Sequence, residues 1–222
     1  MCSLYFVDID LKKESKKICF DNFPQVIKEK IENTKNEKLK TERFLVYEAL
    51  INILLKEVSK EKIEKDFDFD VNGKPYLKNS DIFFSVSHTQ DMALIGVSKN
   101  KIGVDIEKIN DAKIESISKI VSKYAFGKSA NKHNDIDNVN FCYDFCIKKD
   151  LQPKKVDFQE LNEMKKENPY LLWTRIESIL KCDGCGFKNV SSIDEFSDLQ
   201  RTQSFEVEKE KERYIFSVSL EK

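Results

Sequence analysis

Residues 85–107 constrain the fold most strongly, because two β-type segments follow one another there with a short polar turn between them. The first, 92–97, is apolar, and the second, 102–107, alternates apolar and acidic residues after its glycine. Alternate side chains of a strand point to opposite faces, so Asp105 and Glu107 share one face while their apolar neighbours enter a core. The pattern predicts a hairpin formed by 92–97 and 101–107, with its turn at 98–100.

Two carboxylates on one face of a strand can hold a hard divalent cation. Mg²⁺ prefers oxygen ligands, takes one or two protein carboxylates and fills its other positions with water or phosphate. The alternative is that Asp105 and Glu107 are solvated side chains on the exposed face of an ordinary strand. The spacing of the two residues leaves both interpretations open.

The composition is that of a folded protein with a real core. The chain has 222 residues, enough for one large domain or two small ones, and 40% of them are hydrophobic. Charged residues make up 35% but nearly cancel to a net charge of −1, so no overall positive field favours nucleic acid. Because no apolar run is long enough to span a bilayer and no signal-type segment opens the chain, we expect a soluble, cytoplasmic protein.

Six cysteines raise the question of disulfides or zinc. In a chain without a secretion signal they are expected to be thiols. Cys142 and Cys146 could form a zinc site with Cys182 and Cys185. The spacing of the first pair, however, suits one face of a helix better than a zinc knuckle, which disfavours the metal.

The first half of the chain has the pattern of a long helix packed on a mainly antiparallel sheet. Apolar residues recur at helical spacing over 43–58 without Gly or Pro, which predicts a helix beginning near Thr41. The other predicted elements of this half are a turn at 72–76 and short strands at 4–9, 67–70 and 82–86.

The second half repeats this composition. Helical patterns occur over 114–124 and over 158–180, the latter broken at Pro169, and two alternating strands at 205–208 and 214–220 form a predicted antiparallel pair. We therefore expect an α+β fold of two similar halves, 1–109 and 110–222, with a cleft between them. A cleft within one chain makes a monomer the simplest assembly.

Four short motifs occur in order along the chain and are similar to those of one enzyme family. They are Gly-Lys-Pro-Tyr at 73–76, Ser-Val-Ser-His-Thr at 85–89, Ile-Gly-Val-Asp-Ile-Glu at 102–107, and Trp-Thr-Arg-Ile-Glu-Ser-Ile-Leu-Lys at 173–181, followed by Gly-x-Gly-Phe. Their order and spacing resemble the 4′-phosphopantetheinyl transferases of the Sfp-like class. The resemblance covers most of the chain outside about 125–168.

The resemblance implies a pseudo-twofold α+β fold with the active site between the halves. Coenzyme A would lie in this cleft, with Mg²⁺ bridging its diphosphate. A serine hydroxyl of an apo acyl or peptidyl carrier protein would attack the phosphorus attached to pantetheine. Phosphopantetheine would move to the serine, and 3′,5′-ADP would leave.

The resemblance also implies roles for four of these residues in the reaction. Asp105 and Glu107 would hold the metal together with Glu177, and Glu177 would also accept the serine proton. Lys181, one helical turn further on, would stabilise charge on the diphosphate or protonate the leaving group. The alternative for Glu177 and Lys181 is an i,i+4 surface ion pair worth only a few tenths of a kcal/mol.

A second implied set would bind the nucleotide end of coenzyme A. Its members are Lys74, Ser87 and His88, with Arg43 near the 3′-phosphate and Lys30 as a more loosely aligned candidate. A histidine between two hydroxyl residues at a strand end is a plausible donor to phosphate. We expect Trp173 to be a core anchor and not a ligand contact.

The chain also departs from the family pattern. Ile176 stands where the family usually has Lys, Ala125 stands where it tends to have Glu, and 127–168 is longer and more polar than the pattern. These departures leave open a degenerate member that binds coenzyme A or a carrier without transferring the group. A Mg²⁺-dependent phosphodiesterase using the same three carboxylates is a further alternative.

One segment suggests where a carrier protein would dock. No acidic residue occurs in 116–134, whereas Lys119, Lys123, Lys128 and Lys132 are cationic. Carrier proteins of this kind are usually acidic, so electrostatic complementarity predicts docking on this segment. The alternative is an ordinary solvated helix face.

Overall fold

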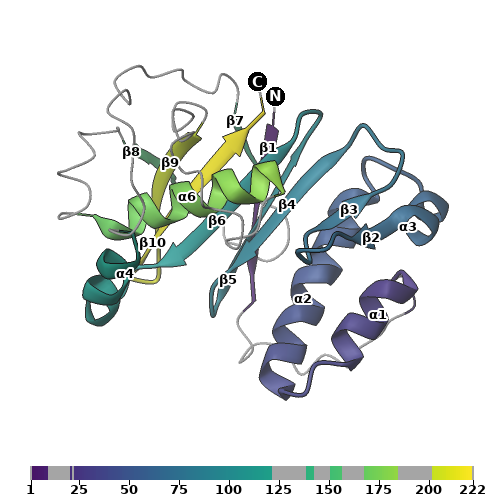
Figure 1. Ribbon diagram of the computed structural model, residues 1–222, viewed down its shortest axis with the longest axis horizontal. Helices are drawn as coiled ribbons and strands as arrows, with labels where there is room; N and C mark the ends of the chain where they lie inside the picture. The colour runs from purple at the N-terminus through teal and green to yellow at the C-terminus, as the bar shows by residue number, and fades with distance from the viewer. Residues whose placement is uncertain are drawn as a thin grey trace.

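The computed structural model describes most of the chain, with the backbone alone at 139–142. The described residues are 2–9, 21, 23–121, 139–142, 151–156, 168–184 and 202–221. In this part of the chain two four-stranded sheets stack face to face, and the outer face of each sheet carries a long helix (Figure 1). The prediction of a mixed α+β protein with small antiparallel sheets is confirmed.

The first sheet has the strand order β4-β5-β1-β7 and holds the N-terminal strand near its centre. β4 and β1 both pair antiparallel with β5, and β7 pairs parallel with β1. The strands are β1 (Cys2–Asp8), β4 (Phe83–His88), β5 (Met92–Ser98) and β7 (Val139–Cys142).

The second sheet is wholly antiparallel and has the order β6-β10-β9-β8. Its strands are β6 (Ile102–Lys108), β8 (Lys154–Val156), β9 (Thr202–Lys209) and β10 (Glu212–Leu220). A separate hairpin joins β2 (Phe67–Phe69) to β3 (Pro75–Leu77). The predicted pairing of the last two strands is therefore confirmed.

Six helical segments complete the described fold. The bounds are α1 (Gln25–Glu32), α2 (Glu37–Leu54), α3 (Lys60–Asp66), the 3-10 helix η1 (Asp111–Lys113), α4 (Ile114–Val121) and α6 (Pro169–Asp183). α2 begins four residues before the predicted start, because the side chain of Asn36 accepts a hydrogen bond from the Leu39 amide and caps its N-terminus. None of the described helices is long and apolar enough to cross a membrane.

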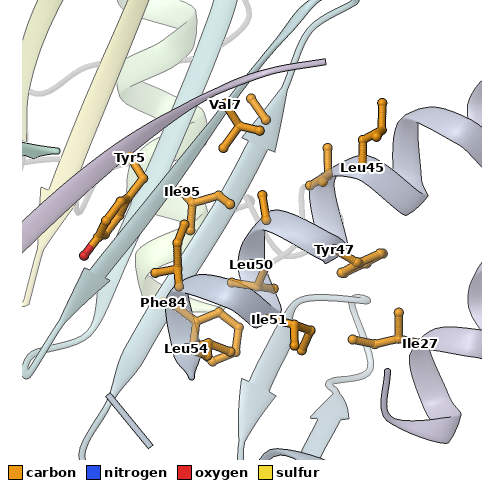
Figure 2. Close-up of a cluster of buried hydrophobic side chains, with 14 of the residues drawn as sticks. Tyr5, Val7, Ile27, Leu45, Tyr47, Leu50, Ile51, Leu54, Phe84 and Ile95 are labelled. Carbon is orange, nitrogen blue, oxygen red and sulfur yellow. The ribbon is translucent and has the colours of Figure 1, made fainter. Parts of the chain in front are cut away.

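Two apolar cores hold these layers together. Between α2 and the first sheet lies a core that includes Leu50, Leu54, Phe84 and Ile95, whose side chains point toward one another in Figure 2. The second core lies between the sheets and contains inward-facing residues of both. They are Leu4, Phe6, Met92 and Leu94 from the first sheet, and Ile102, Val104, Ile106, Phe205, Val207, Tyr214, Phe216 and Val218 from the second.

The outer face of the second sheet meets α6 through hydroxyl groups. Thr174 pairs with Ser217 at 2.8 Å and Ser178 pairs with Ser219 at 2.8 Å, all fully buried. The closest approach is at Gly103, where a Cβ atom would lie 1.9 Å from the carbonyl oxygen of Ser178. Small residues on this face therefore let α6 lie directly on the sheet.

The predicted hairpin between 92–97 and 101–107 is wrong. β5 already pairs with β4 on one edge and β1 on the other, so no edge remains for β6, which pairs with β10 in the other sheet. The two segments face each other across the inter-sheet core instead. A Cβ atom on Gly96 would lie 2.7 Å from Cγ1 of Val104.

Strands from opposite sides of the predicted boundary at 109/110 pair with each other. β6 precedes the boundary but lies in the second sheet, whereas β7 follows it but pairs with β1 in the first. The two sheets therefore exchange strands between 1–109 and 110–222. The division into two similar halves stays a prediction.

Candidate active site

β6 places two carboxylates on the face that meets α6. Asp105 and Glu107 alternate with apolar residues that enter the inter-sheet core, as the sequence predicted. Asp105 is only 3% exposed, whereas Glu107 is half-buried. A buried carboxylate needs a cation or several donors nearby, so the surroundings of Asp105 define the site.

Asp105 lies at the meeting point of three elements. Its Oδ1 accepts a hydrogen bond from Lys181 Nζ on α6 at 2.7 Å and another from Ser87 Oγ on β4 at 2.8 Å. Lys181 Nζ also lies 3.0 Å from Ser87 Oγ. Burial lowers the pKa of Lys181, but the charges of Asp105 and Glu177 outweigh this and raise it, so the ammonium form is favoured.

Glu177 lies one helical turn before Lys181 and is the third carboxylate of the site, after Asp105 and Glu107. Burial raises the pKa of Glu177 to about 7, since the attraction of Lys181 does not offset burial and the negative charges of Asp105 and Glu107. The alternative of a solvated i,i+4 surface pair does not describe this arrangement, because Glu177 is half-buried and the ammonium of Lys181 binds Asp105.

Glu107 has a similar environment and one additional donor. Burial and the charge of Asp105 raise its pKa to about 7, while a hydrogen bond from Trp173 Nε1 to Glu107 Oε1 at 3.3 Å acts in the opposite direction. Trp173 was expected to be a core anchor, but its side chain is half-buried and touches the site. The helical spacing of Trp173 and Glu177 places them on one face and could have indicated this.

The three carboxylates fit a hard cation in their chemistry. Asp105 Oδ2 is buried and has no hydrogen-bond partner among the described residues, so one oxygen is open to a further ligand. Burial raises the pKa of Glu107 and that of Glu177, and the negative charge of Asp105 raises both further; a bound cation would act in the opposite direction. Within the described ranges no three His, Cys, Asp or Glu side chains already stand as close as metal ligands do.

Two pockets open beside these carboxylates. One, of about 250 Å³, is lined by Asn72, Gly73, Lys74, Pro75, Ser85, Val86, Glu177, Leu180, Lys181 and Gly184. The other, of about 730 Å³, includes Glu42, His88, Thr89, Glu107, Lys113, Ile117 and Tyr170 in its lining. The predicted catalytic and metal residues therefore lie between two surface pockets.

Lys74 lies in the smaller pocket, but its ammonium already has protein partners. Lys74 Nζ donates to the main-chain carbonyl oxygen of Lys181 and lies 3.4 Å from that of Ile102. Burial lowers the pKa of Lys74. Its expected role as a nucleotide ligand thus competes with a role in holding α6 and β6 together.

Of the other four expected nucleotide residues, Ser87 bonds to Asp105, while Lys30, Arg43 and His88 lie close enough to influence one another's charge. Lys30 Nζ lies 3.3 Å from the carbonyl oxygen of Gly73, and Arg43 donates to Thr34 Oγ1 at 2.7 Å. Burial is the main reason why the pKa of Lys30 and that of His88 are lowered, and the charge of Arg43 lowers both further. A bound anion would relieve the repulsion between the positive charges of Lys30 and Arg43.

The predicted carrier-docking segment is described only in part. Lys119 on α4 pairs with Glu115 at 2.6 Å, so its charge is partly neutralised. Lys123, Lys128 and Lys132 lie outside the described residues, as does Ala125. The docking prediction therefore stays untested by the fold.

The cysteine prediction also falls largely outside the described residues. Cys182 is buried, and its thiol donates to the carbonyl oxygen of Lys101 at 3.4 Å. The side chains of Cys142, Cys146 and Cys185 are not described.

Comparison with known proteins identifies no family for this chain. No protein-family model matches the chain, and no curated protein has a sequence similar enough to match it.

Proposed function

We propose that this protein is a Mg²⁺-dependent 4′-phosphopantetheinyl transferase that acts on the serine of an apo acyl or peptidyl carrier protein. The observation that carries the proposal is the convergence of Asp105, Glu107, Glu177 and Lys181 from β6 and α6. These are the residues to which the four motifs assign the metal and the proton transfer. They come from segments about 70 residues apart in the chain, so their meeting is not a consequence of sequence proximity.

The reaction needs a base, a charge stabiliser and correct positioning. The carrier serine oxygen forms a bond to the phosphorus attached to pantetheine, and the bond from that phosphorus to 3′,5′-ADP breaks. Glu177 accepts the serine proton, directly or through water, as a carboxylate that lies beside the ammonium of Lys181. Lys181, held as an ammonium by Asp105, stabilises the charge on the departing phosphate.

Asp105, Glu107 and Glu177 would hold the metal ion, because they supply carboxylate oxygens from two elements and Asp105 Oδ2 is open. When bound, Mg²⁺ neutralises the diphosphate oxygens. Trp173 orients Glu107 through its indole N–H. The 3′-phosphate end of coenzyme A would bind the cations Lys30 and Arg43 and accept a hydrogen bond from the imidazole of His88.

The family resemblance also implies features of the fold, the assembly and the carrier that we include in this function. We propose two pseudo-symmetric halves, which is supported by the long helix on the outer face of each four-stranded sheet. We also propose a cytoplasmic monomer that docks its acidic carrier near α4. Each of these features can be tested separately from the chemistry.

Intact-mass measurement tests the proposed reaction directly. An apo acyl carrier protein is incubated with the protein, coenzyme A and Mg²⁺, with and without a chelator. We expect the carrier to gain one phosphopantetheine, and we expect chelator to prevent the gain. Glu177→Gln should abolish the gain, whereas Glu64→Gln, an exposed glutamate on α3, should not.

One observation favours a second candidate, a member that binds coenzyme A without transferring the group. Ile176 is fully buried (0% exposed), so no cation stands there, next to Glu177, where the family usually has Lys. If several apo carriers gain no mass while calorimetry still detects coenzyme A binding, this second function replaces the first. Coenzyme A binding that disappears in Arg43→Ala would then place the bound nucleotide beside Arg43.

A further inference from the structure

The C-terminal end of α6 is held by a turn from the other part of the chain. The last carbonyl groups of a helix have no partners within it and must find donors elsewhere. At this end the carbonyl oxygen of Lys181 accepts from Lys74 Nζ, and that of Gly184 accepts from Asn72 Nδ2 at 2.8 Å. Both donors come from the turn 72–75, more than 100 residues earlier in the chain.

Local contacts fix the backbone of the turn. Asp70 Oδ1 accepts hydrogen bonds from the main-chain amides of Asn72 and Lys74, each at 2.8 Å. Gly73 has a φ of +81°, a conformation that residues with a side chain rarely adopt. The carboxylate and the glycine therefore fix the direction in which the donors Asn72 and Lys74 point.

The ammonium of Lys74 lies where the two site-bearing elements meet. It reaches the carbonyl oxygen of Lys181 at the end of α6 and lies 3.4 Å from that of Ile102 at the start of β6. A positive charge at a helix C-terminus is also favourable, because the helix dipole is negative there. One ammonium thus sets the spacing between the helix that carries Lys181 and the strand that carries Asp105.

We infer that the turn 72–75 acts as a clasp on α6, and that Lys74 is a positioning residue for Lys181 and Glu177. The inference rests on the proposed transferase function and assigns Lys74 a different role from the nucleotide ligand that its motif implies. The same turn lines the pocket that contains Glu177 and Lys181. A substrate in this pocket therefore lies against the clasp, and the clasp holds the reacting side chains in register with it.

The test compares two lysines of the same hairpin. Lys74→Met removes the ammonium from the clasp, while Lys78→Met removes an exposed lysine that pairs with Asp68 at 2.6 Å. In Lys74→Met we expect amide hydrogen exchange in the last turn of α6 to accelerate about tenfold or more. We expect kcat to fall by about ten- to a hundredfold, because small displacements of catalytic groups have effects of this size. The KM for coenzyme A should stay within about twofold, and Lys78→Met should change none of these values.

Two further variants keep the inference testable if Lys74→Met folds poorly. Lys74→Arg keeps a cation with several donors and should recover part of the lost kcat. Asn72→Ala removes only the bond to Gly184 and should accelerate exchange in the same turn, with a smaller loss of kcat. An increase in the KM for coenzyme A, with kcat and exchange unchanged, would show that Lys74 is a ligand contact and overturn the inference. If the wild-type protein transfers no phosphopantetheine, the proposed function fails, while the exchange measurement still decides whether the clasp exists.

Discussion

At the scale of single residues, Asp105 organises the candidate site. Its Oδ1 accepts from both Lys181 and Ser87, and its charge raises the pKa of Glu107 and of Glu177. One side chain therefore controls the position of Lys181 and the protonation of two neighbouring carboxyl groups. Replacing it should alter both properties at once.

Asp105→Asn should remove most of the activity and move its pH dependence. The substitution leaves Lys181 without its nearest counter-ion, and breaking such a pair costs about 3 kcal/mol of stability. Transfer should fall by about a hundredfold or more, and the acid limb of the pH–rate profile should move to lower pH because the pKa of Glu177 falls. Ser87→Ala, which keeps the ion pair, should cost less than about tenfold. An unchanged acid limb in Asp105→Asn would contradict the assignment of Glu177 as the base.

The raised pKa values of Glu107 and Glu177 make the metal-free protein less stable at high pH. A carboxyl group whose pKa is raised on folding stabilises the folded state below its unfolded pKa, and this stability is lost as the pH rises through the folded pKa. The window here runs from 4.5 to about 7. The free energy of unfolding should therefore fall less between about pH 5 and pH 8 in the double variant Glu107→Gln, Glu177→Gln than in wild type. The difference between the two losses should be at least about 1 kcal/mol. Urea unfolding at the two pH values measures the difference, and equal losses would contradict the prediction.

Mg²⁺ should reverse this loss when it binds the same carboxylates. Metal binding requires deprotonated ligands and therefore competes with protons. Without coenzyme A, Mg²⁺ should raise the melting temperature more at about pH 8 than at about pH 5.5, where both groups are protonated. Glu177→Gln should reduce the increase. A rise of equal size at both pH values would place the ion elsewhere on the protein.

Part of the site could be predicted from the sequence because it depends on local periodicity. The alternation in 102–107 was enough to place Asp105 and Glu107 on one face, and helical spacing placed Glu177 and Lys181 together. The contact of Lys74 with Lys181 could not be predicted in this way. It depends on how a turn and a helix end, 107 residues apart, meet in the folded chain.

At the scale of secondary-structure elements, the contact between α6 and β6 determines the geometry of the site. Gly103→Ala should displace α6, because the new Cβ would lie 1.9 Å from the main-chain oxygen of Ser178 and 2.3 Å from the amide nitrogen of Cys182. Overpacking of this kind costs about 1–3 kcal/mol, and transfer should fall by more than about tenfold.

Gly96→Ala is the matched control for this prediction. Its Cβ would meet side-chain atoms of Val104, Ile102 and Leu4 in the core between the sheets, at 2.7 to 3.3 Å. We expect a similar loss of stability but a smaller loss of activity at a temperature where both variants are folded, because α6 is not displaced. Chemical denaturation and kcat measure the two effects. Equal losses of activity in the two variants would mean that the contact at Gly103 has no special importance for the site.

The elements themselves were easier to predict than their pairing. Periodicity located most of the described strands, but the hairpin between β5 and β6 was wrong, since pairing depends on which strand edges are already occupied. The start of α2 was also misplaced. Its first turn is rich in Lys and Glu, so the apolar pattern begins late, and the capping residue Asn36 was the better signal.

At the scale of the whole molecule, the exchange of strands and the core between the sheets should make the protein unfold as one unit. The sequence could suggest two similar halves from their repeated composition. It could not reveal that β6 and β7 cross the boundary, because nothing in a strand's own residues identifies its partner. Neither 1–109 nor 110–222 contains all the described strands of either four-stranded sheet.

Cooperative unfolding can be measured with probes in different parts of the fold. Trp173 is the only tryptophan and lies on α6, so its fluorescence follows the second sheet and its helix, while far-UV circular dichroism is dominated by all the helices, including α2. We expect both signals to change at the same urea concentration, as required for a two-state transition. Gly96→Ala, which disturbs only the core between the sheets, should shift both midpoints equally and leave the m-value unchanged. If the tryptophan signal changes first and the remaining helical signal follows in a separate transition, the two sheets unfold independently, and the exchanged strands do not couple them.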